Sequence, residues 1–229
     1  MRILSIDVAF RTLAVCILTT EGDFSLETED TTVDPRWAKV AIERWSTTDI
    51  LKSHGCKAKK VSTVPSERLM HYMINFFDEL DVDLSSLTHV LIERQMGKNK
   101  LTRYLSQCMY TYFFEKLGYS IKRTARGISV VRPKGAAKLE IVHAKYKLTV
   151  LPNIDESCIK ITPKMNDYVI RKALAVAKTD HFITACYMQD AARFKEAHSF
   201  WTGIKTKKLR DDPADALLMG LYVIERDSK

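Results

Sequence analysis

The segment Ile3-Leu4-Ser5-Ile6-Asp7 stands near the start of this 229-residue chain and ends a short apolar run with a carboxylate. Its pattern predicts a buried β-strand over residues 2–6, and the β-rich stretch 12–20 predicts a second strand. Residues 21–23 read Glu-Gly-Asp and predict a turn after it. Working outward from this pair of strands decides the fold class.

A second carboxylate ends another apolar run further along the chain. Residues 89–92 predict a buried strand, and Glu93 ends it. If the two strands are neighbours in one sheet, Asp7 and Glu93 meet, and a helix packed across the sheet could bring Asp212 and Asp215 to the same place. Taken singly, each carboxylate also fits a solvated strand end or, for Asp212, a helix N-cap.

The remaining sequence predicts alternating strands and helices. The expected elements are a strand within 41–50, a helix from Pro65, a helix over 101–117, strands within 119–132, a helix over 138–147, helices over 169–178 and 182–194, and a helix from Pro213. We therefore expect one α/β domain over 1–229 with a mixed sheet. Residues 148–200 form its less typical segment, interpreted as helical packing or as an elaboration for junction binding or dimerisation.

The charge is unevenly distributed. Lys and Arg total 36 against 28 Asp and Glu, a formal net charge of +8, yet residues 94–147 alone hold 13 basic and two acidic residues, or +11. A solvated face normally mixes both signs, so this block favours a polyanionic partner, nucleic acid before membrane.

Targeting and redox signals point to the cell interior. The longest run without Asp, Glu, Lys or Arg has 11 residues, against about 20 for a membrane helix. Asp7 interrupts any signal-peptide core. The five cysteines are odd in number and form no C-x-x-C pair, which favours free thiols in a reducing compartment. We therefore expect an intracellular protein without a signal peptide or transmembrane segment.

Four clustered carboxylates would repel one another and would therefore require cations. Their hard oxygen atoms favour Mg²⁺ or Mn²⁺ over zinc. Two such ions can activate a water molecule and stabilise the leaving oxygen in phosphodiester hydrolysis. An acidic site in a basic chain thus predicts a nuclease.

The chain resembles the poxvirus and giant-virus Holliday junction resolvases, relatives of bacterial RuvC and the fungal mitochondrial resolvases in the RNase H-like superfamily. The motifs that carry the resemblance are residues 3–7 followed by Leu13-Ala14-Val15, the run Leu91-Ile92-Glu93-Arg94-Gln95, and residues 207–218, which read KKLRDDPADALL. The similarity covers about 1–147 and 198–226. The chain departs from the family at Ala9 and Thr12, where Gly and Asn are common.

This resemblance implies an RNase H-like fold, a mixed five-stranded sheet flanked by helices, with a helical insertion. It implies two Mg²⁺ or Mn²⁺ ions held by Asp7, Glu93, Asp212 and Asp215. It also implies a homodimer that resolves four-way junctions by paired symmetric nicks, in viral-type recombination and concatemer processing in the host cytoplasm.

The resemblance further implies a catalytic lysine just after the strand that follows the central helix. We assign Lys138 to this role, with Lys134 as the alternative; the ordinary interpretation is a surface lysine in a basic helix. The residues expected to bind DNA are Arg11, Arg94, Lys98, Lys100, Arg103, Lys134, Lys207 and Lys208. The ordinary alternative for the group after Glu93 is a set of solvated charges at a helix end.

Three other functions compete with this interpretation. A ribonuclease H or a transposase-like nuclease would share the fold and the carboxylates. A junction-binding protein without catalysis would gain only repulsion from acids beside DNA. A sugar-kinase-like or actin-like ATPase needs a glycine-rich phosphate loop after the first Asp, and residues 7–11 contain no glycine.

Overall fold

The computed structural model describes residues 1–21, 37, 39–95, 100–125 and 127–228, without the side chain of Lys207. Within these residues, five strands form the central sheet: β1 (Arg2–Asp7), β2 (Leu13–Thr20), β3 (Val40–Thr48), β4 (His89–Arg94) and β7 (Lys138–His143). Their order is β3-β2-β1-β4-β7. The pairs β1–β2 and β2–β3 are antiparallel, whereas β1–β4 and β4–β7 are parallel. The expected mixed five-stranded sheet is therefore confirmed.

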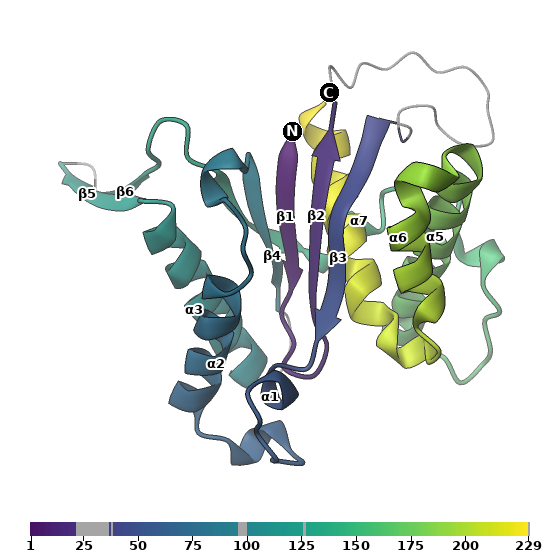
Figure 1. Cartoon of the computed structure of the whole chain (residues 1–229), viewed down its shortest axis with the longest axis horizontal. Helices are drawn as coiled ribbons and strands as arrows, with labels where there is room; N and C mark the ends of the chain where they lie inside the picture. The colour runs from purple at the N-terminus through teal and green to yellow at the C-terminus, as the bar shows by residue number, and fades with distance from the viewer. Residues whose placement is uncertain (22–36, 38, 96–99, 126, 229) are drawn as a thin grey trace.

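Helices cover both faces of this sheet (Figure 1). They are α1 (Ile50–Ser53), α2 (Ser66–Asp78), α3 (Lys100–Lys116), α4 (Ala144–Lys147), α5 (Asp167–Gln189), α6 (Ala191–Gly203) and α7 (Asp211–Asp227). Short 3₁₀ turns are η2 (Val61–Thr63), η3 (Leu84–Ser86), η4 (Glu156–Cys158) and η5 (Lys207–Leu209). A separate two-stranded ribbon consists of β5 (Ser120–Thr124) and β6 (Gly127–Val131). Among the described residues, no helix has the length and apolar character to cross a membrane.

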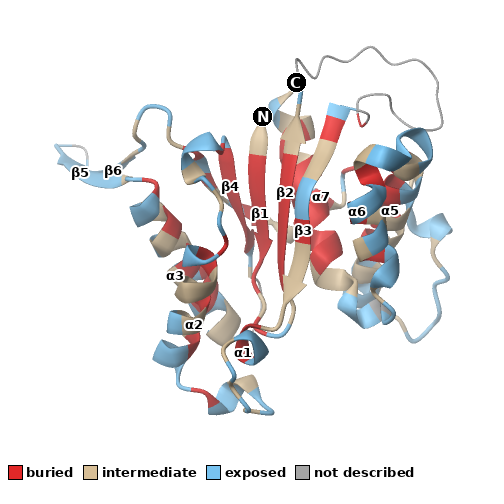
Figure 2. Ribbon diagram, in the orientation of Figure 1, coloured by how far each residue is buried: buried red, intermediate tan, exposed pale blue. Residues whose placement is uncertain are grey.

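Alternation along the strands builds two cores, one on each face of the sheet. In β2, Ala14, Cys16 and Leu18 pack with α5, α6 and α7, whereas Leu13, Val15 and Ile17 pack with α2 and α3. This period of two is the geometry of a strand buried on both sides. Figure 2 shows the resulting buried centre of the sheet.

Close packing fixes α7 against β1 and β2. A Cβ atom at Gly220 would lie 2.5 Å from Leu18 Cδ1, so any larger residue there would force the Leu18 side chain to move. Ser5 Oγ donates a hydrogen bond of 2.7 Å to the carbonyl of Ala216. These contacts set the position of the acidic first turns of α7 relative to the sheet.

Two sequence-based expectations are wrong. The predicted helix over 138–147 is the strand β7 followed by the short α4. Leu139 and Val142 are three residues apart, a helical spacing, but they lie in different cores because residues three apart on a strand face opposite ways. The predicted break between helices near residue 180 is the middle of α5, where the buried Thr179 interrupts the apolar pattern. The chain breaks instead at Asp190, whose side chain caps α6.

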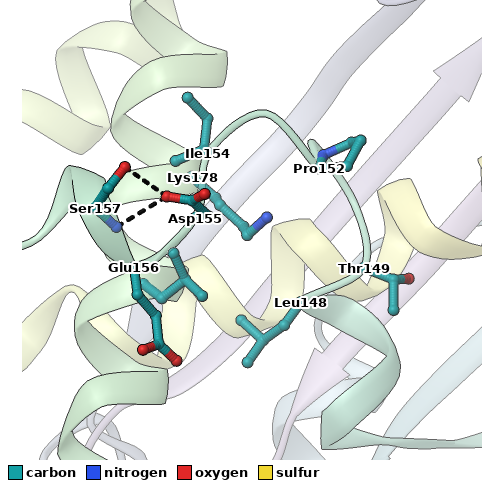
Figure 3. Close-up of a pocket in the computed structure, with 9 residues that line it drawn as sticks. Leu148, Thr149, Pro152, Ile154, Asp155, Glu156, Ser157 and Lys178 are labelled. Atoms are coloured by element: carbon teal, nitrogen blue, oxygen red, sulfur yellow. Dashed lines mark hydrogen bonds between the residues drawn. The ribbon is translucent and has the colours of Figure 1, made fainter.

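The less typical segment 148–200 packs into the fold. The indole rings of Trp45 in β3 and Trp201 in α6 stack with centroids 5.2 Å apart. The loop before α5 surrounds an open hollow lined by Pro152, Asp155 and Lys178, among others (Figure 3). The Lys178 ammonium donates 2.7 Å hydrogen bonds to the carbonyls of Val150 and Leu151, which hold this loop on α5.

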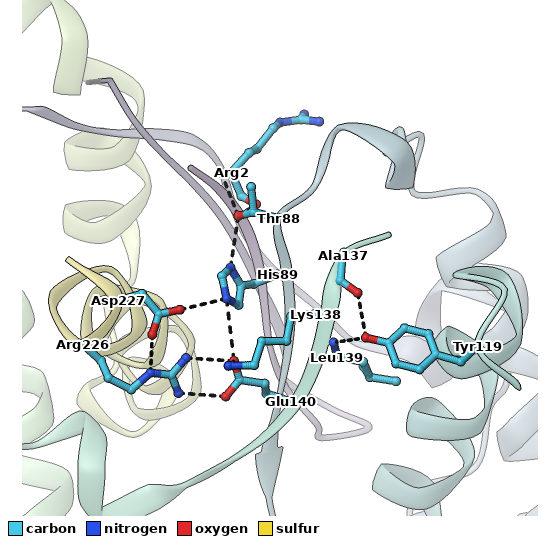
Figure 4. Close-up of polar contacts among 10 residues, drawn as sticks. All are labelled: Arg2, Thr88, His89, Tyr119, Ala137, Lys138, Leu139, Glu140, Arg226 and Asp227. Atoms are coloured by element: carbon cyan, nitrogen blue, oxygen red, sulfur yellow. Dashed lines mark hydrogen bonds and ion pairs between the residues drawn. The ribbon is translucent and has the colours of Figure 1, made fainter. Parts of the chain in front are cut away.

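An ion-pair network joins β4, β7 and α7 at the edge of the sheet where β7 begins (Figure 4). Arg226 donates two hydrogen bonds of 2.8 Å to Glu140, and Lys138 Nζ lies 2.9 Å from the same carboxylate. His89 Nε2 lies 3.0 Å from Asp227 Oδ2. Burial raises the pKa of Glu140, but the hydrogen bonds from Arg226 and Lys138 outweigh burial and lower its pKa overall.

The lowered pKa of Glu140 predicts an acid-sensitive contribution to stability. Above its ordinary pKa, the ionised carboxylate stabilises the fold, and this stabilisation is lost as the pH falls through the lower folded-state pKa. We expect Glu140→Gln to reduce the free energy of unfolding by about 1–2 kcal/mol at pH 7, a value discounted for partial exposure. Urea unfolding at pH 7 and at about pH 3 measures this difference, which should shrink at low pH. Glu115→Gln on the exposed face of α3 is the control, and a difference independent of pH would contradict the assignment.

Candidate metal centre

Three buried carboxylates converge at the carboxyl ends of β1 and β4. The parallel register pairs Ile6 with Ile92, so Asp7 and Glu93 leave neighbouring strands side by side. Asp215, in the second turn of α7, points at the same place. One oxygen of each lies within 4.8 Å of the others. The structure therefore brings together three of the four predicted carboxylates.

The fourth, Asp212, lies one helical turn before Asp215 and is more exposed. Its carboxylate accepts a hydrogen bond from the Thr12 hydroxyl in the loop between β1 and β2. The expected N-cap role for Asp212 is not observed, because α7 begins at Asp211 and the N-cap residue, Arg210, makes no side-chain capping bond. Asp212 therefore lies beside the cluster and contributes negative charge to it.

Lys147 supplies the positive charge inside the cluster, and sequence reasoning missed it. The ammonium lies 2.5 Å from Glu93 Oε1 and 2.5 Å from Asp215 Oδ2, and the side chain is buried. It comes from α4, just after β7, whereas the catalytic lysine was expected earlier, at Lys138 or Lys134. Lys138, the predicted catalytic lysine, is the first residue of β7 and pairs with Glu140. This is the end of the strand far from α4 and the carboxylates. The structure therefore does not bring Lys138 to the carboxylates.

Lys134, the alternative, is exposed in the loop before β7 and also lies outside the cluster. The catalytic lysine was assigned to the wrong residue because a helix was predicted over 138–147, which hid the strand β7 and the residue at which it ends. A strand ending at His143 would have pointed to Lys145 and Lys147.

Two further polar side chains complete the site. Gln95 donates hydrogen bonds to Asp7 Oδ1 at 3.3 Å and to Glu93 Oε2 at 3.1 Å. Lys172 of α5 places its ammonium 3.5 Å from oxygens of Asp211 and Asp212. Lys172 lies in the less typical segment, where the sequence offered no signal for a site residue, whereas Gln95 belongs to a quoted motif.

Burial and mutual repulsion control protonation in this cluster. Burial, followed by the charge of Glu93, raises the pKa of Asp7 well above its ordinary value. Burial also raises the pKa of Asp215, to about 6, against the opposing charge of Lys147. Burial raises the pKa of Glu93, but the charge of Lys147 and hydrogen bonds from Asp7 and Lys147 lower it overall. Without a metal, Glu93 is therefore the favoured anion, and Asp7 is the favoured site for a proton.

The three clustered groups offer only carboxylate oxygens, which fit a hard divalent cation such as Mg²⁺ or Mn²⁺. A divalent ion would replace the proton on Asp7 and relieve the repulsion between the acids. A second group, His89, Glu140 and Asp227, also has ligand atoms within 4.8 Å of one another. Its two carboxylates already pair with Arg226 and Lys138, so it is a weaker metal candidate.

The predicted DNA-binding residues divide into three groups. The first group is exposed and forms no ion pair with any described residue: Arg94, Lys100, Arg103, Lys134 and Lys208. Arg11 instead pairs with Asp49 at 3.0 Å and donates to the carbonyls of Ala58 and Lys59, so it braces a loop. Lys98 and the side chain of Lys207 lie outside the described part of the chain.

Comparison with solved structures identifies the fold. A Fowlpox virus resolvase, solved with a substrate Holliday junction DNA, aligns over 100% of both chains with a TM-score of 0.52 and 14% identity. The yeast mitochondrial Holliday junction resolvase aligns over 96% of this chain and 76% of its own, with a TM-score of 0.52 and 14% identity. The chain has the RNase H-like fold of these resolvases. RuvC of Thermus thermophilus aligns with a TM-score of 0.48 and 10% identity, over 100% of this chain and 98% of its own.

The predicted resemblance is thus confirmed at the level of the fold. Family models and curated proteins gave no match to the sequence.

Removing the buried ammonium should destabilise the metal-free protein. Lys147→Met leaves Glu93 and Asp215 without their closest counter-charge, and losing one partner of a buried pair typically costs about 3–5 kcal/mol. Urea unfolding in EDTA measures this loss, and added Mn²⁺ should restore part of it through binding to the folded state. Lys145→Met, two residues earlier and exposed, is the control. Equal stability of Lys147→Met and wild type in EDTA would contradict the role of Lys147.

Proposed function

We propose that this protein is a metal-dependent endonuclease that resolves four-way DNA junctions by paired nicks. The observation that carries the proposal is the convergence of Asp7, Glu93 and Asp215 from two parallel strands and a crossing helix. Phosphodiester hydrolysis by divalent ions needs such an oxygen-rich site. The fold shared with two Holliday junction resolvases supports the choice of substrate.

Mg²⁺ or Mn²⁺ bound by Asp7, Glu93 and Asp215, with Asp212 as a further ligand, would activate a water molecule and stabilise the leaving oxygen. The protein residues provide the setting for this chemistry. Gln95 orients the oxygens of Asp7 and Glu93 through its two hydrogen bonds. Lys147 holds Glu93 and Asp215 together and presents a positive charge that can contact the scissile phosphate.

The basic block supports a nucleic acid as the substrate. Arg94, Lys100 and Arg103 are exposed close in sequence to Glu93, and Lys208 is exposed just before the acidic turns of α7. Phosphates bound by these side chains would lie next to the carboxylates. Lys98 and Lys207 remain predicted members of this surface.

A homodimer follows from the reaction itself, because paired nicks require two sites related by the symmetry of the junction. A role in viral-type DNA recombination and concatemer processing in the host cytoplasm belongs to the same proposal. A non-catalytic binding protein is disfavoured because three buried acids cost free energy that a binding protein would not recover.

Cleavage of a synthetic four-way junction tests the proposal. With Mg²⁺, wild type should cut the junction at symmetric positions in preference to linear duplex or an RNA–DNA hybrid. Asp215→Asn should reduce cleavage at least about 100-fold while retaining junction binding, since even outer-shell changes at metal sites commonly cost 10–100-fold. Asp167→Asn, exposed on α5, is the matched control. Equal cutting of linear duplex would disprove the resolvase assignment, and preference for the hybrid would indicate a ribonuclease H.

A further inference from the structure

The ribbon formed by β5 and β6, which lies between α3 and β7 in the chain, projects from the body of the protein (Figure 1). Every described residue in its two strands is exposed except Val131, which is partly buried (Figure 2). Tyr119 anchors its base, where the phenol donates to the carbonyl of Ala137 at 2.9 Å and accepts from the amide of Leu139 at 3.0 Å. The ribbon therefore extends from a fixed point at the start of β7.

One face of the ribbon carries three apolar side chains and Arg123, although it lies in solvent. The register pairs Ile121 with Val130 and Arg123 with Ile128, and paired residues of antiparallel strands face the same way. Ile121, Ile128 and Val130 are 63%, 72% and 56% exposed. Apolar side chains clustered at such exposure are typical of a surface that meets a partner.

The charge around this face points to a polyanion. From Lys116 to Lys138 the sequence contains seven basic residues and no acidic residue. Lys122, Arg123, Arg132 and Lys134 are exposed and form no ion pair within the described part of the chain. Pairing the ribbon with its copy in a second molecule would set these cations against one another, whereas a nucleic acid would neutralise them.

We propose that the ribbon enters a groove of a duplex arm that runs from the metal centre along α3. Helix α3 begins five residues after Gln95 and ends four residues before the ribbon, so its 17 residues separate the two sites. That helix spans about 25 Å, which corresponds to about 7 base pairs of duplex. This inference rests on the proposed function, because it assigns the second contact of the same DNA.

The ribbon has the dimensions and chemistry for this contact. A two-stranded β-ribbon fits the major groove, where apolar side chains contact thymine methyl groups. Ile121, Ile128 and Val130 would face the groove. Arg123 shares their face and would reach a phosphate beside the groove, whereas Lys122, on the opposite face, would extend its long side chain around the edge of the ribbon to the DNA backbone. Arg103, exposed at the start of α3, would lie along the same arm.

Arm length tests this inference directly. Binding is measured in the non-cleaving Asp215→Asn background with two kinds of junction. One has arms of about 6 base pairs closed by hairpin loops, and the other has arms of about 20 base pairs. Only the longer arms reach the ribbon. Lys122→Glu/Arg123→Glu should weaken binding to the long arms and leave binding to the short arms unchanged. On long arms, its slope of log affinity against log salt should become shallower by about 2.

Ile128→Ser should weaken binding to long arms without changing the salt slope. Lys160→Glu/Lys195→Glu, exposed on the opposite side of the sheet, is the charge-matched control and should not depend on arm length. Equal effects of the ribbon variants on both arm lengths, or no effect, would overturn the inference. Loss of a dimer by Ile128→Ser in sedimentation would overturn it in favour of a second copy. If wild type cuts junctions but the ribbon variants weaken binding equally for both arm lengths, only this inference fails. If the ribbon variants weaken binding to long arms alone but wild type cuts no junction, only the proposed function fails.

Discussion

The parallel pairing of β1 with β4 is the constraint on which the site depends. Because Ile6 pairs with Ile92, two carboxylates meet where the backbone leaves the sheet. The third comes from α7, whose approach is set by the contact of Gly220 with Leu18 and by the hydrogen bond from Ser5. These helix–sheet contacts thus hold α7 where Asp215 reaches the cluster.

Collecting acids in a buried place has an electrostatic cost that the rest of the structure offsets. Lys147 neutralises Glu93 and Asp215 directly, and Lys172 balances Asp211 and Asp212 from α5. The less typical segment that contains α5 is therefore part of the site as well as part of the core. A divalent cation fits the negative charge that these two lysines leave uncompensated, and it would displace the proton favoured on Asp7.

The sequence contained enough information for four of the five strands of the sheet and for the acids, because those depend on local patterns. Asp7 and Glu93 each end an apolar run, and Asp215 opens an apolar helix. The role of Lys147 could not be predicted because it depends on where the preceding strand, β7, ends. That strand is defined by its non-local pairing with β4, whereas Leu139 and Val142 have the spacing of a helix. Lys172 could not be found because its helix carries no motif and its position follows from packing alone.

Anomalous diffraction from crystals soaked in Mn²⁺ tests the central claim, that the carboxylates beside Lys147 form a metal site. The account predicts an anomalous peak bounded by oxygens of Asp7, Glu93 and Asp215, and loss of that peak in Asp215→Asn. Crystals that show the full carboxylate cluster with Lys147 between Glu93 and Asp215, and no peak at saturating Mn²⁺, would contradict it.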